Sequence, residues 1–155
     1  MSATALLTAA VLLAADSPLG DGAIDNYIID SAVHVTNGVI VLLAMVATTV
    51  YLIRLALKGK PVDRLARVLL AVAQISLAIQ ALLGIKLLDQ GMGVVQLFIH
   101  YIGGLAPLGL FIAAGWFAWR DRVRHTRVLA VLATVGLLSA GMAFTIGQEY
   151  ANRMG

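Results

Sequence analysis

Four long apolar segments constrain this chain more than any other feature of its sequence. They cover residues 28–57, 65–88, 94–119 and 128–146. Each offers the roughly 20 apolar residues that a helix needs to cross a bilayer core of about 30 Å. Because the connections are short, consecutive helices should be antiparallel neighbours. The sequence therefore predicts an all-α fold, an integral membrane four-helix bundle with up-down-up-down topology over residues 28–155.

Composition supports the same class and excludes several others. Apolar residues make up 61% of the chain and charged residues 12%, whereas soluble domains carry about a quarter charged residues. We therefore expect the lipid bilayer to be the main partner of this protein. The absence of cysteine excludes disulfides, thiolate metal sites and cysteine nucleophiles.

The basic residues predict how the bundle is oriented. Nine of the eleven Lys and Arg residues fall within residues 54–67 and 120–127, which we expect to be two loops. Positive charge next to spanning helices favours the cytoplasmic side, so both termini should lie on the outer side of the cell inner (cytoplasmic) membrane, which the chain crosses several times. This clustering needs no nucleic-acid partner. His125, in the second loop, should be solvated.

Residues 1–27 precede the bundle and should form a separate region. Residues 5–15 are an apolar run that is too short to span a bilayer, and no Lys or Arg precedes it, which a signal peptide would need. We expect an N-terminal apolar segment at the outer membrane surface rather than a cleaved signal. An acidic, turn-rich outer loop follows it, with Asp16, Asp21, Asp25 and, at its end, Asp30.

Two histidines are the main candidates for chemistry. His34 lies twenty residues before Arg54, and His100 lies twenty residues before Arg120. At 1.5 Å per residue, each histidine is about 30 Å from the basic end of its helix, so the two should be level. Their helices run in the same direction and should be diagonal in the bundle. This placement predicts a haem b, or a related haem, with both imidazoles as axial ligands of the iron.

A glycine follows each histidine by four residues, at Gly38 and Gly104. Residues four apart share a helix face, so we expect both glycines to leave clearance for a flat macrocycle. Lys86 should reach the same depth from the second helix, where it would pair with a haem propionate, or with Asp89 if no haem is present.

Other polar residues within the helices have more ordinary interpretations. Asn37 and Gln96 are close enough to the histidines to support them by hydrogen bonds. Gln74, Gln80 and Thr145 should form hydrogen bonds between helices. Histidines near a membrane interface also serve as polar anchors, and glycines as packing residues, so a bundle without haem stays an alternative.

A non-haem metal site is a further alternative. It is less well supported by the sequence, because Asp30 is the only candidate carboxylate near the level of the histidines.

The order of these features resembles one four-helix half of the haem A synthase family. The shared features are an early histidine (His34), a basic turn, the segment QALLG at residues 80–84, and a histidine early in the third helix (His100). The resemblance implies that His34 and His100 are axial haem ligands and that QALLG packs helices together. The family typically has arginine after the first histidine, where this chain has Val35, and its loop cysteines are absent here. These departures favour haem binding over the family's oxidation of a haem methyl group.

Three functions follow from these patterns. The first is a membrane b-type cytochrome with one bis-histidine haem near the outer face, which transfers single electrons, for example as a respiratory-chain subunit. The second, which would make the protein an enzyme, is a half-size haem A synthase-like protein that works as a homodimer. The third is an accessory subunit of a membrane complex that carries no pigment. The sequence leaves open whether the protein is an enzyme.

Overall fold

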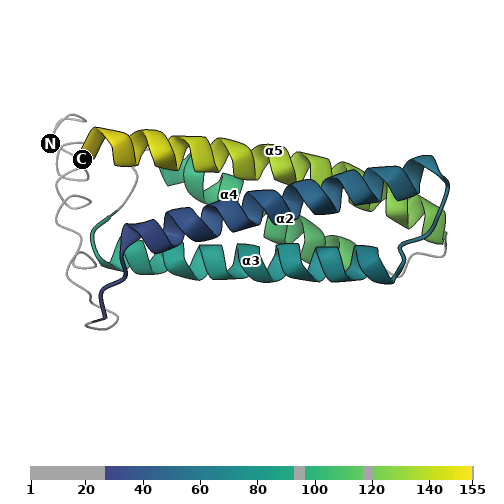
Figure 1. Ribbon diagram of the computed structural model, residues 1–155, viewed down its shortest axis with the longest axis horizontal. Coiled ribbons are helices and arrows are strands. Elements are labelled where there is room, and N and C mark those ends of the chain that lie inside the picture. The colour runs from purple at the N-terminus through teal and green to yellow at the C-terminus, as the bar shows by residue number, and fades with distance from the viewer. Residues whose placement is uncertain (1–26, 93–96, 117–120, 155) are drawn as a thin grey trace, which may run out of the picture.

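The computed structural model describes residues 27–92, 97–116 and 121–154, which form four helices (Figure 1). They are α2 (Ser31–Leu57), α3 (Arg64–Asp89), α4 (Leu97–Trp116) and α5 (Arg122–Met154). Consecutive helices run in opposite directions, as Figure 1 shows. The predicted all-α up-down four-helix bundle is therefore confirmed. The N-terminal apolar segment and most of the acidic loop predicted before it lie outside the described residues.

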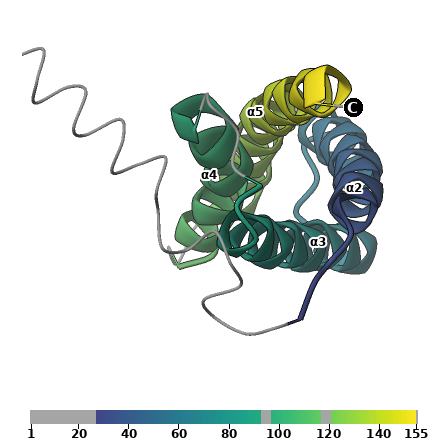
Figure 2. The ribbon, with the colours of Figure 1, turned by 90° about the vertical axis from the view of Figure 1, so that its left-hand side faces the viewer.

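The helices surround a common axis in chain order. In Figure 2, α3 and α5 each lie between α2 and α4, and the same neighbour pairs pack against one another. Within the described residues, α2 and α4 are thus diagonally opposite. We call the end that contains the start of α2 and the end of α3 the histidine end. The other end, with residues 58–63 and the start of α5, is the basic end.

Aspartates begin three of the helices. The side chain of Asp30 accepts a hydrogen bond from the backbone N–H of Ala32 at 2.8 Å, at the start of α2. Asp63 accepts one from Ala66 at the start of α3, and Asp121 one from Val123 at the start of α5, both at 2.9 Å. Side-chain oxygens at this position satisfy backbone donors that have no partner within the helix. These short acidic residues therefore fix where the spanning segments begin.

Glycines end α2 and α3. Gly59 has a φ of 60° and Gly91 a φ of 77°, a left-handed conformation that side chains disfavour. After Gly59, the N–H of Lys60 donates to the carbonyl of Leu55 at 3.0 Å, and Met92 makes the matching bond after Gly91 at 2.9 Å. This hydrogen-bond pattern is the Schellman motif. The chain therefore reverses direction directly after each helix.

The core holds few large side chains, and many large apolar side chains face outward. Met45, Leu52 and Phe111 fill the interior together with small residues such as Ala73 and Ala133. Large apolar residues are exposed on every helix, among them Ile40, Leu43, Val50, Val72, Ile75, Leu82, Ile112, Val131 and Leu138. Apolar surface of this extent is typical of contact with lipid. The outward faces therefore agree with a membrane location.

Three of the helices are long and apolar enough to cross a membrane: α2, α3 and the part Arg122–Glu149 of α5. In α4, the described apolar part is shorter, His100–Gly115. The chain is thus a multi-pass membrane protein by the length and composition of its helices. That α4 is also a complete span stays a prediction, because segments outside the described residues flank it on both sides.

The predicted helix bounds were least accurate in the fourth segment. It was expected over residues 128–146, but α5 begins at Arg122 and continues to Met154. The basic residues from Arg122 to Arg127 are therefore helical, and not part of a loop as predicted. The hydrogen bonds that Asp121 accepts from Val123 and Arg124 explain this early start, because they allow the helix to form before the apolar run.

Candidate functional site

The two histidine rings face one another across the interior at the histidine end. His34 of α2 and His100 of α4 have ring centroids 6.3 Å apart, and the ring planes are inclined by 52°. Both rings are half-buried. The helices that carry them are diagonal, so the side chains bridge the width of the bundle. The prediction that both imidazoles are level and point inward is confirmed.

Each imidazole lies against a glycine of the helix that follows its own. A Cβ atom at Gly84 of α3 would lie 3.4 Å from Cε1 of His34, and one at Gly147 of α5 would lie 3.1 Å from Cε1 of His100. Larger side chains at these two positions would press on the rings. From the sequence, Gly84 was predicted only as a packing residue, and Gly147 was not predicted to have a role. The sequence pattern did not single out either glycine as a neighbour of a histidine, because these contacts depend on how the neighbouring helices are rotated about their axes.

A hydrogen bond to the backbone fixes the proton of His100. Its Nδ1 lies 2.9 Å from the carbonyl oxygen of Ala143 in α5. A carbonyl only accepts, so Nδ1 carries the hydrogen and donates it. In the neutral ring, Nε2 then keeps its lone pair. Metal-binding histidines typically donate their other N–H to a carbonyl or carboxylate in this way, so His100 has the hydrogen-bond pattern of a metal ligand.

A chain of amides fixes the proton of His34. The amide nitrogen of Asn37 donates to the carbonyl oxygen of Ser76 at 3.2 Å and to Oε1 of Gln80 at 2.7 Å. Because the Ser76 carbonyl only accepts, the orientation of Asn37 is determined, and that of Gln80 follows from it. Gln80 therefore presents its NH₂ group to Nε2 of His34, 3.0 Å away. In the neutral ring, Nε2 accepts this bond and Nδ1 carries the hydrogen.

One polar atom of this site is left without a hydrogen bond. Nδ1 of His34 is buried and has no partner within the described residues. A buried donor without an acceptor costs about 1–3 kcal/mol. The two histidines therefore differ: the lone pair of His100 Nε2 is available, whereas Gln80 donates to that of His34. A metal ion at His34 Nε2 would take the place of the Gln80 hydrogen.

The two predicted glycines lie in different surroundings. A Cβ atom at Gly104 would meet nothing within 4 Å, so there is open space beside this glycine, and its use by a macrocycle stays a prediction. A Cβ atom at Gly38 would lie 3.0 Å from the ring of Phe144 and 3.4 Å from Nε2 of Gln80. The expectation of open space beside Gly38 is therefore wrong in this structure. Gly38 instead lets the aromatic ring of Phe144 pack closely against α2.

Lys86 pairs with a carboxylate of its own helix. Its Nζ donates to Oδ2 of Asp89 at 2.6 Å, and both side chains are buried. This is the arrangement expected in the absence of haem. Asp30 caps α2, and no group of three or more His, Asp or Glu residues suited to a metal ion occurs among the described residues. Gln96, the other predicted neighbour of a histidine, lies outside them.

Comparison with known proteins adds no relative. No family model, no curated protein and no solved structure matches this chain. The resemblance to the haem A synthase family therefore stays a prediction, based on the residues quoted for it. The site has to be judged by its own geometry.

The other polar residues agree with their predictions in part. Gln80 forms the expected bonds between helices, through His34 and Asn37. Thr145 instead donates to the carbonyl of Gly141 in its own helix, so its predicted bond between helices is wrong. His125 is half-buried on α5, where its ring bonds to the backbone of Ala114, and is not solvated as predicted. Helix α5 begins early enough to carry His125 into the bundle.

Proposed function

We propose that this protein is a membrane b-type cytochrome in which His34 and His100 are the axial ligands of one haem. A haem with both axial positions taken by imidazoles supplies one-electron transfer. The protein would then exchange electrons with a partner, such as a subunit of a respiratory chain. The observation that carries the proposal is the separation of the two rings.

The ring separation matches that of two imidazoles on one metal ion. A metal–imidazole bond is about 2 Å long and the ring centre lies about 1 Å behind the nitrogen, so two imidazoles on opposite sides of a metal have centroids about 6 Å apart. The centroids of His34 and His100 are 6.3 Å apart. Two histidines that touch directly, or that are bridged by a water molecule, are not held at a centroid separation of about 6 Å. The observed separation therefore favours a shared metal centre.

The hydrogen bonds of the rings support the same assignment. Ala143 holds the hydrogen of His100 on Nδ1, which leaves Nε2 as the ligand atom. At His34 the lone pair of Nε2 accepts a hydrogen bond from Gln80, so a haem iron would have to displace that bond. Ligand atoms must be unprotonated, and both nitrogens meet this condition in the neutral rings.

Small residues flank the pair of histidines. Gly84 of α3 and Gly147 of α5 lie against the rings, and the space beside Gly104 of α4 is open. Because these glycines have no side chain, they leave more space around the histidines, and a planar macrocycle needs such space. Phe144 lies at Gly38 and would have to share this space with the haem. Lys86 would bind a propionate in competition with Asp89.

We also propose that the basic end faces the cytoplasm and that the haem is near the outer face. The support is the number of Arg and Lys residues around residues 58–63 and along the first turns of α5, which favours retention on the inner side. The membrane would then be the cell inner membrane, with both termini outside.

Optical spectroscopy tests the haem proposal. The protein, expressed with ample haem and purified in detergent, should give a reduced-minus-oxidised spectrum with a low-spin b-type band. His34→Ala and His100→Ala should each abolish the low-spin band, because one axial ligand is lost. His125→Ala removes an imidazole at the basic end and should keep the band.

Two results would contradict the proposal. Protein that stays colourless with ample haem would favour the accessory subunit without pigment. A low-spin band that survives in both His34→Ala and His100→Ala would place any haem elsewhere. Extraction of the bound haem would also test the enzyme alternative, because a hydroxylated or formylated haem is expected only from a haem A synthase-like activity.

A further inference from the structure

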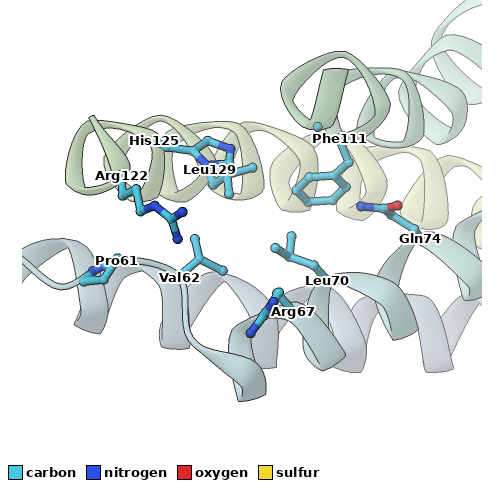
Figure 3. A pocket seen from close by; sticks show the side chains of 10 residues that line it. Pro61, Val62, Arg67, Leu70, Gln74, Phe111, Arg122, His125 and Leu129 are labelled. Atoms are coloured by element: carbon cyan, nitrogen blue, oxygen red, sulfur yellow. The ribbon is translucent and has the colours of Figure 1, made fainter. Parts of the chain in front are cut away.

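A cavity at the basic end has no role in the proposed haem site. It has a volume of about 380 Å³ and lies among α3, α4, α5 and the loop between α2 and α3 (Figure 3). Its position is at the opposite end of the bundle from the two facing histidines. The residues that line it are Pro61, Val62, Arg67, Leu70, Gln74, Phe111, Gly115, Arg122, His125 and Leu129.

The lining combines cationic and apolar groups. Arg67 of α3 and Arg122 of α5 are cationic residues of the lining, and none of the described lining residues carries a carboxylate. Leu70, Phe111 and Leu129 form an apolar wall beside them, and in Figure 3 Arg122 extends from α5 toward the side of the loop and α3. A ligand that suits both parts has an anionic group and an apolar body.

Among the described residues, neither of these two arginines takes part in an ion pair. Within the described residues, the ion pair of the protein is between Lys86 and Asp89, at the other end. The two nearby carboxylates, Asp63 and Asp121, accept backbone hydrogen bonds at the starts of α3 and α5. Arginine offers several donors in a planar fork that suits phosphate. The charges of Arg67 and Arg122 are therefore available to an external anion.

The bundle is also least tightly closed on this side. Helices α3 and α4 pack less closely together than the other neighbouring pairs, and both contribute to the cavity wall. Gly115 of α4 lines the cavity, is exposed, and has no side chain to close the gap between these helices. A ligand can thus approach from the lipid as well as from the aqueous side.

We propose that this cavity binds the phosphate group of an anionic amphiphile, with Arg67 and Arg122 as its cationic partners. The apolar chain of the ligand packs along Leu70 and Phe111. A membrane phospholipid with a net negative headgroup has this chemistry and is present around every spanning protein. The site is independent of the haem proposal, because it shares no residue with it.

Binding of phosphatidylglycerol to the purified protein in detergent, measured by native mass spectrometry, tests the proposal. Phosphatidylglycerol should bind at least about tenfold more tightly than zwitterionic phosphatidylcholine. Replacing both arginines, with Arg67→Gln and Arg122→Gln, should weaken it at least about tenfold, since hydrogen bonds to charged groups are among the strong ones. The matched control is Arg64→Gln with Arg124→Gln, on the same helices and outside the cavity, which should change binding less than about twofold.

A second variant tests the cavity without changing charge. A Cβ atom at Gly115 would meet nothing within 4 Å, so Gly115→Leu should fold and fill part of the cavity. It should weaken phosphatidylglycerol binding severalfold. Gly109→Leu is the control, because Gly109 of α4 is also unobstructed and does not line the cavity.

A competition experiment with inorganic phosphate distinguishes a lipid headgroup from free phosphate as the natural ligand. If millimolar inorganic phosphate displaces the lipid, the site binds free phosphate; if it does not, the apolar chain is required and the ligand is a lipid. The proposal is overturned if phosphatidylglycerol shows no preference over phosphatidylcholine. It is equally overturned if the control arginine pair weakens binding as much as Arg67 and Arg122, or if Gly115→Leu has no effect.

Discussion

At the scale of single residues, the hydrogen bonds of the two histidines determine what the site can bind. Ala143 uses a backbone carbonyl to hold the proton of His100, whereas Gln80 uses a side chain that donates to His34. The backbone contact cannot be removed by mutation of a side chain, but the Gln80 contact can. Gln80 is therefore the position at which the properties of the site can be changed without loss of a ligand.

We expect Gln80→Leu to tighten haem binding about threefold, because the hydrogen that competes for the lone pair of His34 is removed. A side-chain hydrogen bond between membrane helices contributes about 0.6 kcal/mol on average, which corresponds to this factor. The measurement is a haem titration of apoprotein from haem-limited cells. Gln148→Leu, an exposed position on α5, is the control. Loss of the low-spin band in Gln80→Leu would show that Gln80 supports His34 instead of competing for it.

Gly136 tests the close packing of α4 against α5. A Cβ atom there would lie 3.0 Å from Cε of Met45 and 3.1 Å from Cβ of Pro107, so Gly136→Leu should overpack the core. We expect the free energy of unfolding to fall by about 1–3 kcal/mol. The control is Gly141→Leu, because a Cβ atom at Gly141 would meet nothing within 4 Å. Equal stability of the two variants in thermal unfolding would contradict the observed contact.

At the scale of the elements, the helix ends are specified locally and the helix faces are specified by their neighbours. Asp30, Asp63 and Asp121 begin helices, and Gly59 and Gly91 end them. These residues act through hydrogen bonds and backbone conformation within a few positions, independently of the rest of the bundle. The apolar faces, by contrast, depend on the neighbouring helices. A face that packs against another helix is buried, and the remaining faces are exposed to lipid.

The cap at Asp63 predicts a dependence of stability on pH. Hydrogen bonds from the N–H of Ala66 and the hydroxyl of Tyr51 hold the pKa of the Asp63 carboxyl below its ordinary value of 3.8. A lowered pKa means that this contribution is fully present above pH 3.8 and is lost as the pH falls through the folded-state pKa.

Asp63→Ala should therefore lower the thermal midpoint by more at pH 7 than at about pH 2, because the contribution of the carboxylate decreases as the pH falls through its lowered folded-state pKa. Tyr51→Phe, which removes one of the two bonds and keeps the cap, should have a smaller effect of the same sign. Thermal unfolding in detergent at the two pH values measures both. A difference between wild type and Asp63→Ala that is equal at both pH values would assign the effect to something other than the carboxylate.

At the scale of the whole molecule, the two ends of the bundle carry different chemistry. One end holds the facing histidines and the buried pair of Lys86 and Asp89, and the other holds a cavity with Arg67 and Arg122. The bundle separates these two regions by the length of its helices. The orientation of the bundle in the membrane thus decides on which side each function would occur.

Because the chain has no cysteine, its topology is testable with single introduced thiols. Lys60→Cys labels the basic end, and Met92→Cys labels an exposed position at the histidine end. In intact cells, a maleimide that does not cross the membrane should label Met92→Cys, and Lys60→Cys only after permeabilisation. The cysteine-free protein is the background control. The reverse pattern would place the basic end outside and overturn the proposed orientation.

The sequence by itself determined the class of the protein and the level of its histidines. Runs of about 20 apolar residues have few alternatives to a spanning helix, and a helix converts residue number into depth at a constant rise. The equal spacing of His34 from Arg54 and of His100 from Arg120 was therefore enough to predict that the two rings would be level.

Only the tertiary structure decided what each ring touches. The contacts of His34 with Gln80 and Gly84, and of His100 with Ala143 and Gly147, join residues more than forty positions apart. They depend on the rotation of each helix about its axis, which a nearly uniform apolar sequence leaves undetermined. The same rotation placed Phe144 beside Gly38 and opened a cavity at Arg67 and Arg122, because in lipid the close fit of side chains, and not apolarity, selects the facing surfaces.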